Sequence, residues 1–196
     1  MARDILMASY QFATPAPPSP APPSPNNAVE STGVGDNITV RWLDLGTTPP
    51  QCPAAVGGIC TRSYSIAPST SGIAGATSLF LRSEGGVNQE LVEGVEAMQT
   101  RYGVCADTNG DGIIDTVNPP YLTAAQVTAG PPPIDWDNVC SVRIDLRLVS
   151  LEDNIVNATQ TLIFPADTGT SFTPNPADRR LRQGFSTTVV IRNRVR

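Results

Sequence analysis

The sequence contains no histidine and no lysine, so all 13 of its basic residues are arginine. Catalysis by Ser-His-Asp or Cys-His groups and metal binding through imidazole are therefore excluded. Charged residues make up 16% of the chain, against roughly a quarter in an ordinary soluble domain. The formal net charge is −5, and scattered arginines in an acidic chain give no reason to expect nucleic-acid binding. These absences favour a structural or binding protein over an enzyme.

The chain also lacks a long apolar run. No segment reaches the roughly 18 apolar residues that a membrane-spanning helix needs, and the first residues lack the charged-then-apolar pattern of a signal peptide. Residues 1–12 instead place Ile5, Leu6 and Tyr10 at helical spacing among good helix formers. We interpret residues 1–12 as the C-terminal end of a helix whose beginning is missing from this sequence.

Proline and glycine are abundant, with 19 and 16 residues. Residues 13–27 (ATPAPPSPAPPSPNN) favour polyproline II, which predicts a linker. Residues 28–196 carry the alternating apolar and polar pattern of strands and are expected to form one globular head domain. In the segment 139–151, Arg143, Asp145 and Arg147 are predicted to face away from the core. Strands are predicted at residues 37–45, 62–67, 77–83, 139–151, 159–164 and 185–195.

One segment within this strand pattern predicts a helix, namely residues 89–103 (QELVEGVEAMQTRYG). Its apolar residues follow the spacing of an amphipathic helix, although Gly94 weakens it: Leu91, Val92, Val95, Met98 and Tyr102. Glu90, Glu93 and Glu96 would lie near one another on this helix and resemble a catalytic carboxylate pair, but a solvated acidic helix face is the favoured interpretation. Residues 175–182 predict a short helical turn with Asn175 as its N-cap. The expected fold class is α+β, an antiparallel sheet with a helix on one face.

Four cysteines occur, at Cys52, Cys60, Cys105 and Cys140. Their spacing does not fit a zinc site, which usually needs two close pairs. Proximity in sequence favours two disulfides, Cys52–Cys60 and Cys105–Cys140, in an oxidising compartment. Four cysteines allow three connectivities, and free buried thiols are the alternative.

Residues 107–115 (DTNGDGIID) have the spacing of a calcium-binding loop. Oxygen-bearing side chains occupy its first, third and fifth positions, and Gly112 stands at the sixth, where positive φ is needed. The carbonyl of the seventh residue and a carboxylate at the ninth complete the predicted ligand set, which is Asp107, Asn109, Asp111, Ile113 and Asp115. The twelfth position is Asn118 instead of the usual Glu, so we expect modest affinity and a structural Ca²⁺. A plain surface turn made by Asp, Asn and Gly is the alternative.

Two further features have a plain and a functional interpretation. Trp136 lies between Asp135 and Asp137, where it either packs over a loop or offers a stacking surface for a sugar. The arginines at 179, 180 and 182 form a solvated turn or meet an acidic partner surface.

The order of several segments resembles the PilW-type minor pilins of bacterial type IV pili and, more distantly, the GspJ pseudopilins of type II secretion. The segments are ARDILMASY, LVEGVEAMQTRYGV followed by DTNGDGIID, DWDNVCSVRIDLRLVS, and DRRLRQGFSTTVVIRNR. The resemblance covers the beginning of the chain and most of residues 89–196, whereas residues 13–88 do not contribute to it.

The resemblance implies a pilin-like fold, in which the end of the N-terminal helix packs on an antiparallel sheet. It also implies a non-catalytic minor pilin that contributes to pilus assembly, priming or the tip complex. The implied partners are other minor pilins, the major pilin and a pilus-tip adhesin, and the membrane is contacted only through the missing part of the helix. The implied location is the bacterial inner membrane and periplasm before assembly, then the extracellular fibre. Strand edges and the predicted 91–98 helix are the candidate subunit contacts.

Two other functions stay open at this stage. A type II secretion pseudopilin would share the fold and the assembly logic but would serve protein export. A free-standing extracellular module would bind a glycan or surface near Trp136 and use calcium for stability.

Overall fold

This computed structural model describes residues 37–43, 59–83, 86–105, 121–130, 138–166 and 168–190. The predicted helix end at residues 1–12 and the predicted linker at residues 13–27 lie outside these described residues.

A first antiparallel sheet contains four strands in the order β1-β2-β3-β4. They are β1 (Ile38–Leu43), β2 (Ile59–Pro68), β3 (Thr77–Ser83) and β4 (Asn88–Glu93). The first three confirm predicted strands, because each alternates residues that face the core with residues that do not. β4 falls where a helix was predicted.

A second antiparallel sheet has the order β10-β7-β5-β6. Its strands are β5 (Val95–Val104), β6 (Tyr121–Leu122), β7 (Val139–Val149) and β10 (Arg182–Val190). β7 pairs with both β10 and β5 over most of its length, so it is the central strand of this sheet. β7 and β10 confirm the predicted strands at 139–151 and 185–195.

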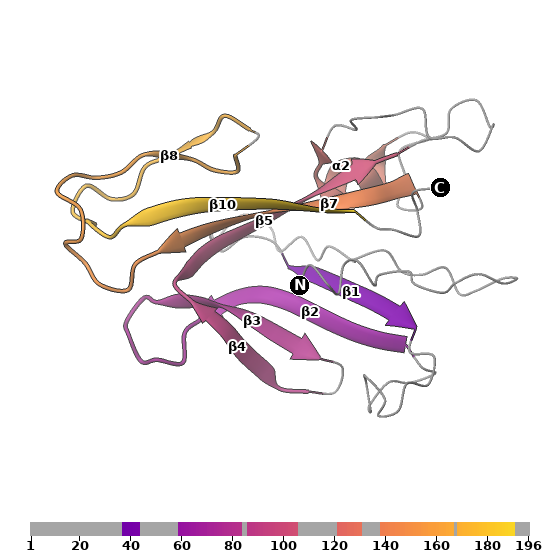
Figure 1. Cartoon of the computed structure of the whole chain (residues 1–196), viewed down its shortest axis with the longest axis horizontal. Coiled ribbons are helices and arrows are strands. Elements are labelled where there is room, and N and C mark those ends of the chain that lie inside the picture. The colour runs from indigo at the N-terminus through magenta and orange to yellow at the C-terminus, as the bar shows by residue number, and fades with distance from the viewer. Residues whose placement is uncertain are drawn as a thin grey trace, which may run out of the picture.

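A small hairpin and one short helix complete the described elements. The hairpin consists of β8 (Leu162–Ile163) and β9 (Ser171–Phe172), and β8 lies inside the strand predicted at 159–164. The helix α2 (Ala124–Ala129) begins after Thr123, which forms a capping box with Gln126. Figure 1 shows the two large sheets facing each other, with the β8 hairpin on the side of the second sheet away from the first.

The predicted helix at residues 89–103 is wrong, because this segment forms β4 and β5. The helical spacing has two causes. Gly94 turns the chain from one sheet into the other between Val92 and Val95, and a bulge at Glu96 shifts the register between Val95 and Ala97. Each interruption changes a spacing of two into a spacing of three, so two bent strands imitate a helix.

Gly94 is the corner at which the two sheets join. Its N–H donates to the Thr77 carbonyl at 2.9 Å, and its own carbonyl accepts from the Val149 N–H at 2.8 Å. Its φ is +78°, and a Cβ at this position would lie 2.5 Å from the Val149 carbonyl oxygen. Only glycine fits both the backbone conformation and the close approach.

The short helical turn predicted at residues 175–182 is a single turn. The Asp178 N–H donates to the Asn175 carbonyl at 2.8 Å, and the Asn175 side chain accepts from the Ala177 N–H at 3.0 Å. The chain then extends into β10, because one isolated helical turn has too few hydrogen bonds to sustain itself.

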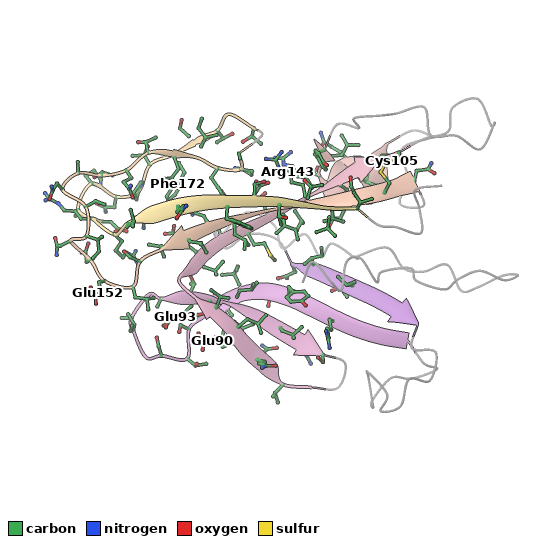
Figure 2. All side chains as sticks on the ribbon, in the orientation of Figure 1. Glu90, Glu93, Cys105, Arg143, Glu152 and Phe172 are labelled. Atoms are coloured by element: carbon green, nitrogen blue, oxygen red, sulfur yellow. A yellow bond between two sulfur atoms is a disulfide. The ribbon has the colours of Figure 1, made fainter. Side chains whose placement is uncertain are left out.

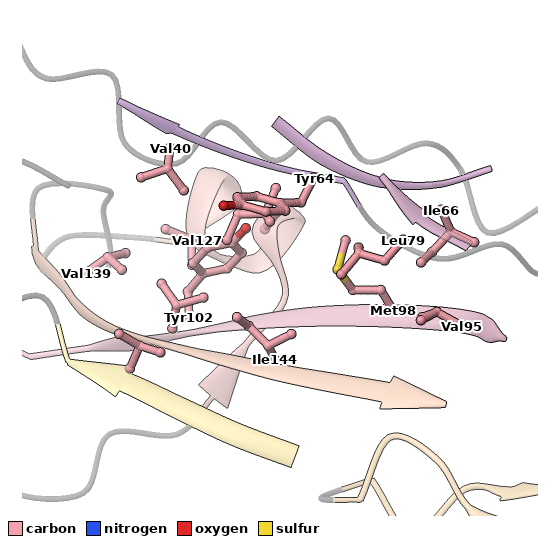
Figure 3. Close-up of a cluster of buried hydrophobic side chains, with 14 of the residues drawn as sticks. Val40, Tyr64, Ile66, Leu79, Val95, Met98, Tyr102, Val127, Val139 and Ile144 are labelled. Carbon is pink, nitrogen blue, oxygen red and sulfur yellow. The ribbon is translucent and has the colours of Figure 1, made fainter. Parts of the chain in front are cut away.

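The main core lies between the two sheets (Figure 3). Each sheet directs alternate apolar side chains into it, and α2 adds Ala124 and Val127. The largest fully buried side chains of the cluster are Tyr64, Tyr102, Ile38, Met98 and Ile144. The antiparallel sheet of the expected α+β class is confirmed, but α2 at residues 124–129 stands where the sequence predicted no helix. Among the described residues, no helix is long and apolar enough to cross a membrane.

Candidate functional site

Most of the residues predicted to bind a ligand lie outside the described part of the chain. These are the calcium ligands Asp107, Asn109, Asp111, Ile113 and Asp115, together with Trp136. Cys52 is also outside, and Cys60 is described only through the backbone of β2. Among the described residues, no group of three or more Asp, Glu, Cys or His side chains could hold a metal ion.

The predicted disulfide between Cys105 and Cys140 is confirmed, with the two Cα atoms 5.6 Å apart. It joins the end of β5 to the start of β7 (Figure 2). In the sequence, Cys105 comes immediately before the segment with the predicted calcium ligands. The disulfide therefore fixes Cys105, which precedes that segment in the sequence, to β7.

The three glutamates of the segment 89–103 do not come together. Glu90 and Glu93 lie on β4 and both contact Ser69, whose Oγ is 2.8 Å from Glu90 and 2.7 Å from Glu93 (Figure 2). Ser78 and Thr70 also donate to Glu90, and these hydrogen bonds lower the pKa of Glu90 to about 2, with the bond from Ser78 contributing most. Glu96 lies instead on the second sheet, so only Glu90 and Glu93 of the three share a contact.

Glu96 is the centre of an ionic cluster on the outer face of the second sheet. Arg147 Nε donates to Glu96 Oε2 at 2.8 Å, and Arg182 donates to both oxygens at 3.1 and 3.0 Å. Arg182 Nη2 also donates to Asp178 at 2.6 Å, and Asp178 binds Arg180 through two hydrogen bonds. We call these five residues the Glu96 cluster.

The Glu96 cluster is largely withdrawn from solvent. The side chain of Arg182 is 2% exposed, that of Arg147 10%, and that of Glu96 22%. Burial by itself would raise the pKa of Glu96, but the hydrogen bond from Arg182 and the charge of Arg147 outweigh it and lower the pKa. Hydrogen bonds from Arg180 and Arg182 also lower the pKa of Asp178. Both carboxylates are thus ionised at neutral pH and serve as counter-ions rather than as proton donors.

Aromatic rings cover the same cluster. The Arg147 guanidinium carbon lies 3.5 Å from the ring centre of Phe172 and 5.1 Å from that of Phe164. Arg182 lies 5.9 Å from the Phe172 ring. Because both rings belong to the segment between β7 and β10, these cation–π contacts hold that segment and its hairpin on the outer face of the second sheet.

The sequence predicted part of this arrangement. The outward direction of Arg143, Asp145 and Arg147 is confirmed by alternation along β7, and Arg143 pairs with Asp145 at 3.2 Å. The partners of Arg147 could not be identified from the sequence, because Glu96 and Phe172 are far from it along the chain. The predicted solvated turn at residues 179, 180 and 182 is wrong for Arg182, which is buried because Glu96 and Asp178 neutralise its charge.

Most of the exposed large apolar side chains lie in two regions of the described chain. One region surrounds β4 and includes Val87, Leu91 and Val92. The other lies along the segment between β7 and β10 and along β10 itself: Leu151, Ile155, Ile163, Leu181, Phe185 and Val190. Scattered exposed apolar residues are ordinary on a protein surface, but those along β10 coincide with a free sheet edge.

Both a known protein family and solved structures match this chain. Residues 63–193 match the family described as Type IV Pilus-assembly protein W. No curated protein matches the chain. Among solved structures, the type IV-like pilin TTHA1219 from Thermus thermophilus is similar, with 17% identity and a TM-score of 0.42 over 84% of this chain and 82% of that one. Because the family match spans about two thirds of the chain, the chain belongs to the PilW family of type IV pilus-assembly proteins.

Proposed function

We propose that this chain is a minor pilin subunit whose globular head contributes to priming type IV pilus assembly or to the complex at the pilus tip. The single observation that carries the proposal is the family match over residues 63–193, which includes every strand of the second sheet. The head would pack against other minor pilins, the major pilin and a tip adhesin. It would move from the inner membrane and periplasm to the extracellular fibre.

The proposed role is structural and involves no catalytic turnover. A subunit of a fibre needs a head of fixed shape. The Cys105–Cys140 disulfide and the Glu96 cluster both support such rigidity, because each joins segments that are distant in sequence. The type II secretion pseudopilin is the competing assignment, since it would need the same rigid head.

Deleting the gene in the bacterium that encodes it tests the proposal. Electron microscopy is expected to find few or no pili in the deletion strain, and expression of the full chain is expected to restore them. Secreted protein is measured in parallel. Normal piliation combined with a loss of secretion would contradict the pilin proposal and favour the pseudopilin.

We also propose that residues 107–115 bind a structural Ca²⁺, held by Asp107, Asn109 and Asp111 with Ile113 and Asp115 completing the set. The supporting argument is the alternate spacing of oxygen ligands with a glycine at the sixth position. A chelator is expected to lower the melting temperature of the wild-type head and to have no effect on a variant with Asp107→Ala and Asp111→Ala. A wild-type melting temperature that does not respond to calcium would contradict this site.

A further inference from the structure

The free edges of the two large sheets differ in how well they are protected against pairing with another strand. Among the described strands, β1 and β4 end the first sheet, and β6 and β10 end the second. β1 has six residues and carries the charged Arg41. β4 carries a bulge near Leu91 and two glutamates, and β6 has only two residues. Bulges, charges and short length all discourage strand addition. β10 has nine residues and a regular register throughout, so it lacks these protections.

The direction of the β10 backbone groups follows from two hydrogen bonds. The Ser150 N–H donates to the Leu181 carbonyl at 2.8 Å, so residue 181 points toward β7. The Arg182 N–H points the other way and donates to the Gln160 side chain at 2.7 Å. Because successive residues of a strand alternate, Phe185, Thr187 and Val189 bind β7. Gly184, Ser186 and Thr188 present their N–H and carbonyl groups at the free edge.

The side chains along this edge would accept a neighbouring strand. Between Gln183 and Val190 there is no charged residue and no proline. The residues whose backbone groups point outward are small, and Gly184, Ser186 and Thr188 are all exposed. The Gln160 hydrogen bond to Arg182 marks one end of the open edge, which leaves about four residue pairs for a new ladder.

The core-facing side of β10 is incompletely covered. Leu181 is 45% exposed and Phe185 is 55% exposed, although alternation directs both toward the face that holds the core. On the neighbouring strand, Leu146 and Leu148 are only partly buried against the core cluster. An added strand with apolar residues at every second position would extend this core and cover these side chains.

The charges near β10 indicate what kind of strand would pair with its free edge. The exposed Arg179 has no ion pair among the described residues, and it lies just before β10. Three more arginines, at 192, 194 and 196, follow β10 in the sequence. A second copy of β10 paired antiparallel would bring two arginine-rich ends together, which is unfavourable. A strand with carboxylates flanking an apolar centre is complementary.

We propose that the free edge of β10 pairs with an extended strand from a different pilus subunit, one that alternates apolar residues and is flanked by carboxylates. This proposal rests on the proposed function and names the surface through which the head joins its neighbour. The new strand would continue the second sheet beyond β10 by hydrogen bonding to Gly184, Ser186 and Thr188.

Amide hydrogen exchange of the isolated head provides the first test. The amides of Gly184, Ser186 and Thr188 are expected to exchange at least about tenfold faster than those of Phe185, Thr187 and Val189, because only the second set donates to β7. Equal protection of both sets would mean that another part of this chain already occupies the edge, and it would overturn the proposal.

Complementation of the deletion strain provides the second test. Ser186→Pro removes one outward N–H and leaves the hydrogen bonds to β7, whereas the matched control Ser186→Ala keeps the N–H. We expect the alanine variant to restore pili as the wild type does, and the proline variant to give at least a fivefold lower pilus count at equal protein level. If the proline variant loses cooperative melting, Thr188→Pro is used in the same way against Thr188→Ala.

The outcomes of complementation separate the two proposals. Full piliation with a folded proline variant would overturn edge pairing but leave the minor pilin assignment intact. Failure of deletion itself to reduce piliation would overturn the assignment. Both proposals would be supported if the alanine variant restored pili and the proline variant did not, with the proline variant folded and present at the wild-type level.

Discussion

At the scale of single residues, Gly94 determines how the two sheets join. Replacement by alanine would force a Cβ into a positive φ and to within 2.5 Å of the Val149 carbonyl oxygen. We expect Gly94→Ala to lower the free energy of unfolding by about 2–4 kcal/mol, measured by urea denaturation.

Gly184 provides the matched control for this substitution. Its φ is not positive and nothing lies within 4 Å of a Cβ built there, so Gly184→Ala is expected to leave stability within about 0.5 kcal/mol of the wild type. Equal effects of the two substitutions would contradict the role of Gly94 as the sheet junction.

Glu96 is the second residue with a large predicted effect. Glu96→Gln removes the shared counter-ion of Arg147 and Arg182, both of which are largely buried. We expect a loss of about 3 kcal/mol in the free energy of unfolding, because the buried Arg147 loses its counter-ion and the buried Arg182 keeps only Asp178. The exposed Glu152 is the control, and Glu152→Gln is expected to be nearly neutral. A neutral Glu96→Gln variant would contradict the importance of the cluster.

The free energy of unfolding is expected to depend on pH through Glu96 and Asp178. The pKa values of Glu96 and Asp178 are lower in the folded protein than their ordinary values, so their stabilisation is fully present above about pH 4.5 and is lost as pH falls through the folded values. Urea midpoints measured between pH 7 and pH 3 are expected to fall in the wild type. The decline is expected to be shallower in Glu96→Gln, and parallel declines would argue against this assignment.

At the scale of elements, the segment between β7 and β10 is attached mainly through aromatic and ionic contacts. Its only regular structure among the described residues is the β8–β9 hairpin. Phe172→Ala removes the ring 3.5 Å from Arg147. We expect faster amide exchange within residues 150–181 and little change in β5 and β7, since the main core does not include Phe172.

Ile163 on the same hairpin is the control for this prediction. It is more than half exposed, so Ile163→Ala is expected to leave the exchange pattern unchanged. If Phe172→Ala instead increased exchange across both sheets equally, the segment would be an integral part of the main core rather than a separately attached element.

Element type could be predicted from the sequence where alternation was uninterrupted. In β7, Val142 and Ile144 keep a spacing of two on the core face, and Arg143 and Arg147 keep a spacing of four on the outer face, which gave the correct strand and the correct faces. In β4 and β5, the corner at Gly94 and the bulge at Glu96 broke that spacing and imitated a helix. A local pattern cannot distinguish a bent strand from a helix when each bend adds one residue.

The Glu96 cluster illustrates what local patterns could not predict. The bulge at Glu96, which caused β5 to be predicted as a helix, also directs Glu96 toward arginines from β7 and β10. Bulges commonly re-aim a side chain in this way. The ion pairs join residues 51 and 86 positions apart, and only the paired sheet brings them together.

At the scale of the whole molecule, the head is two facing sheets joined at one glycine corner, with a disulfide at one end of the second sheet and an ionic cluster at the other (Figures 1 and 2). The disulfide and the ionic cluster cross-link the second sheet at its two ends. Among the described strands, none pairs with the outer edge of β10. A rigid sheet with one open edge suits a subunit that must join neighbours in a defined orientation.

The most direct test of the central claim, that this chain is a structural subunit of the pilus, is quantitative mass spectrometry of pili sheared from the encoding bacterium. We expect peptides from residues 63–193 in the purified fibres, at a small fraction of the abundance of the major pilin. Complete absence of these peptides from the fibres of a fully piliated strain, with the chain retained in the cells, would contradict the account.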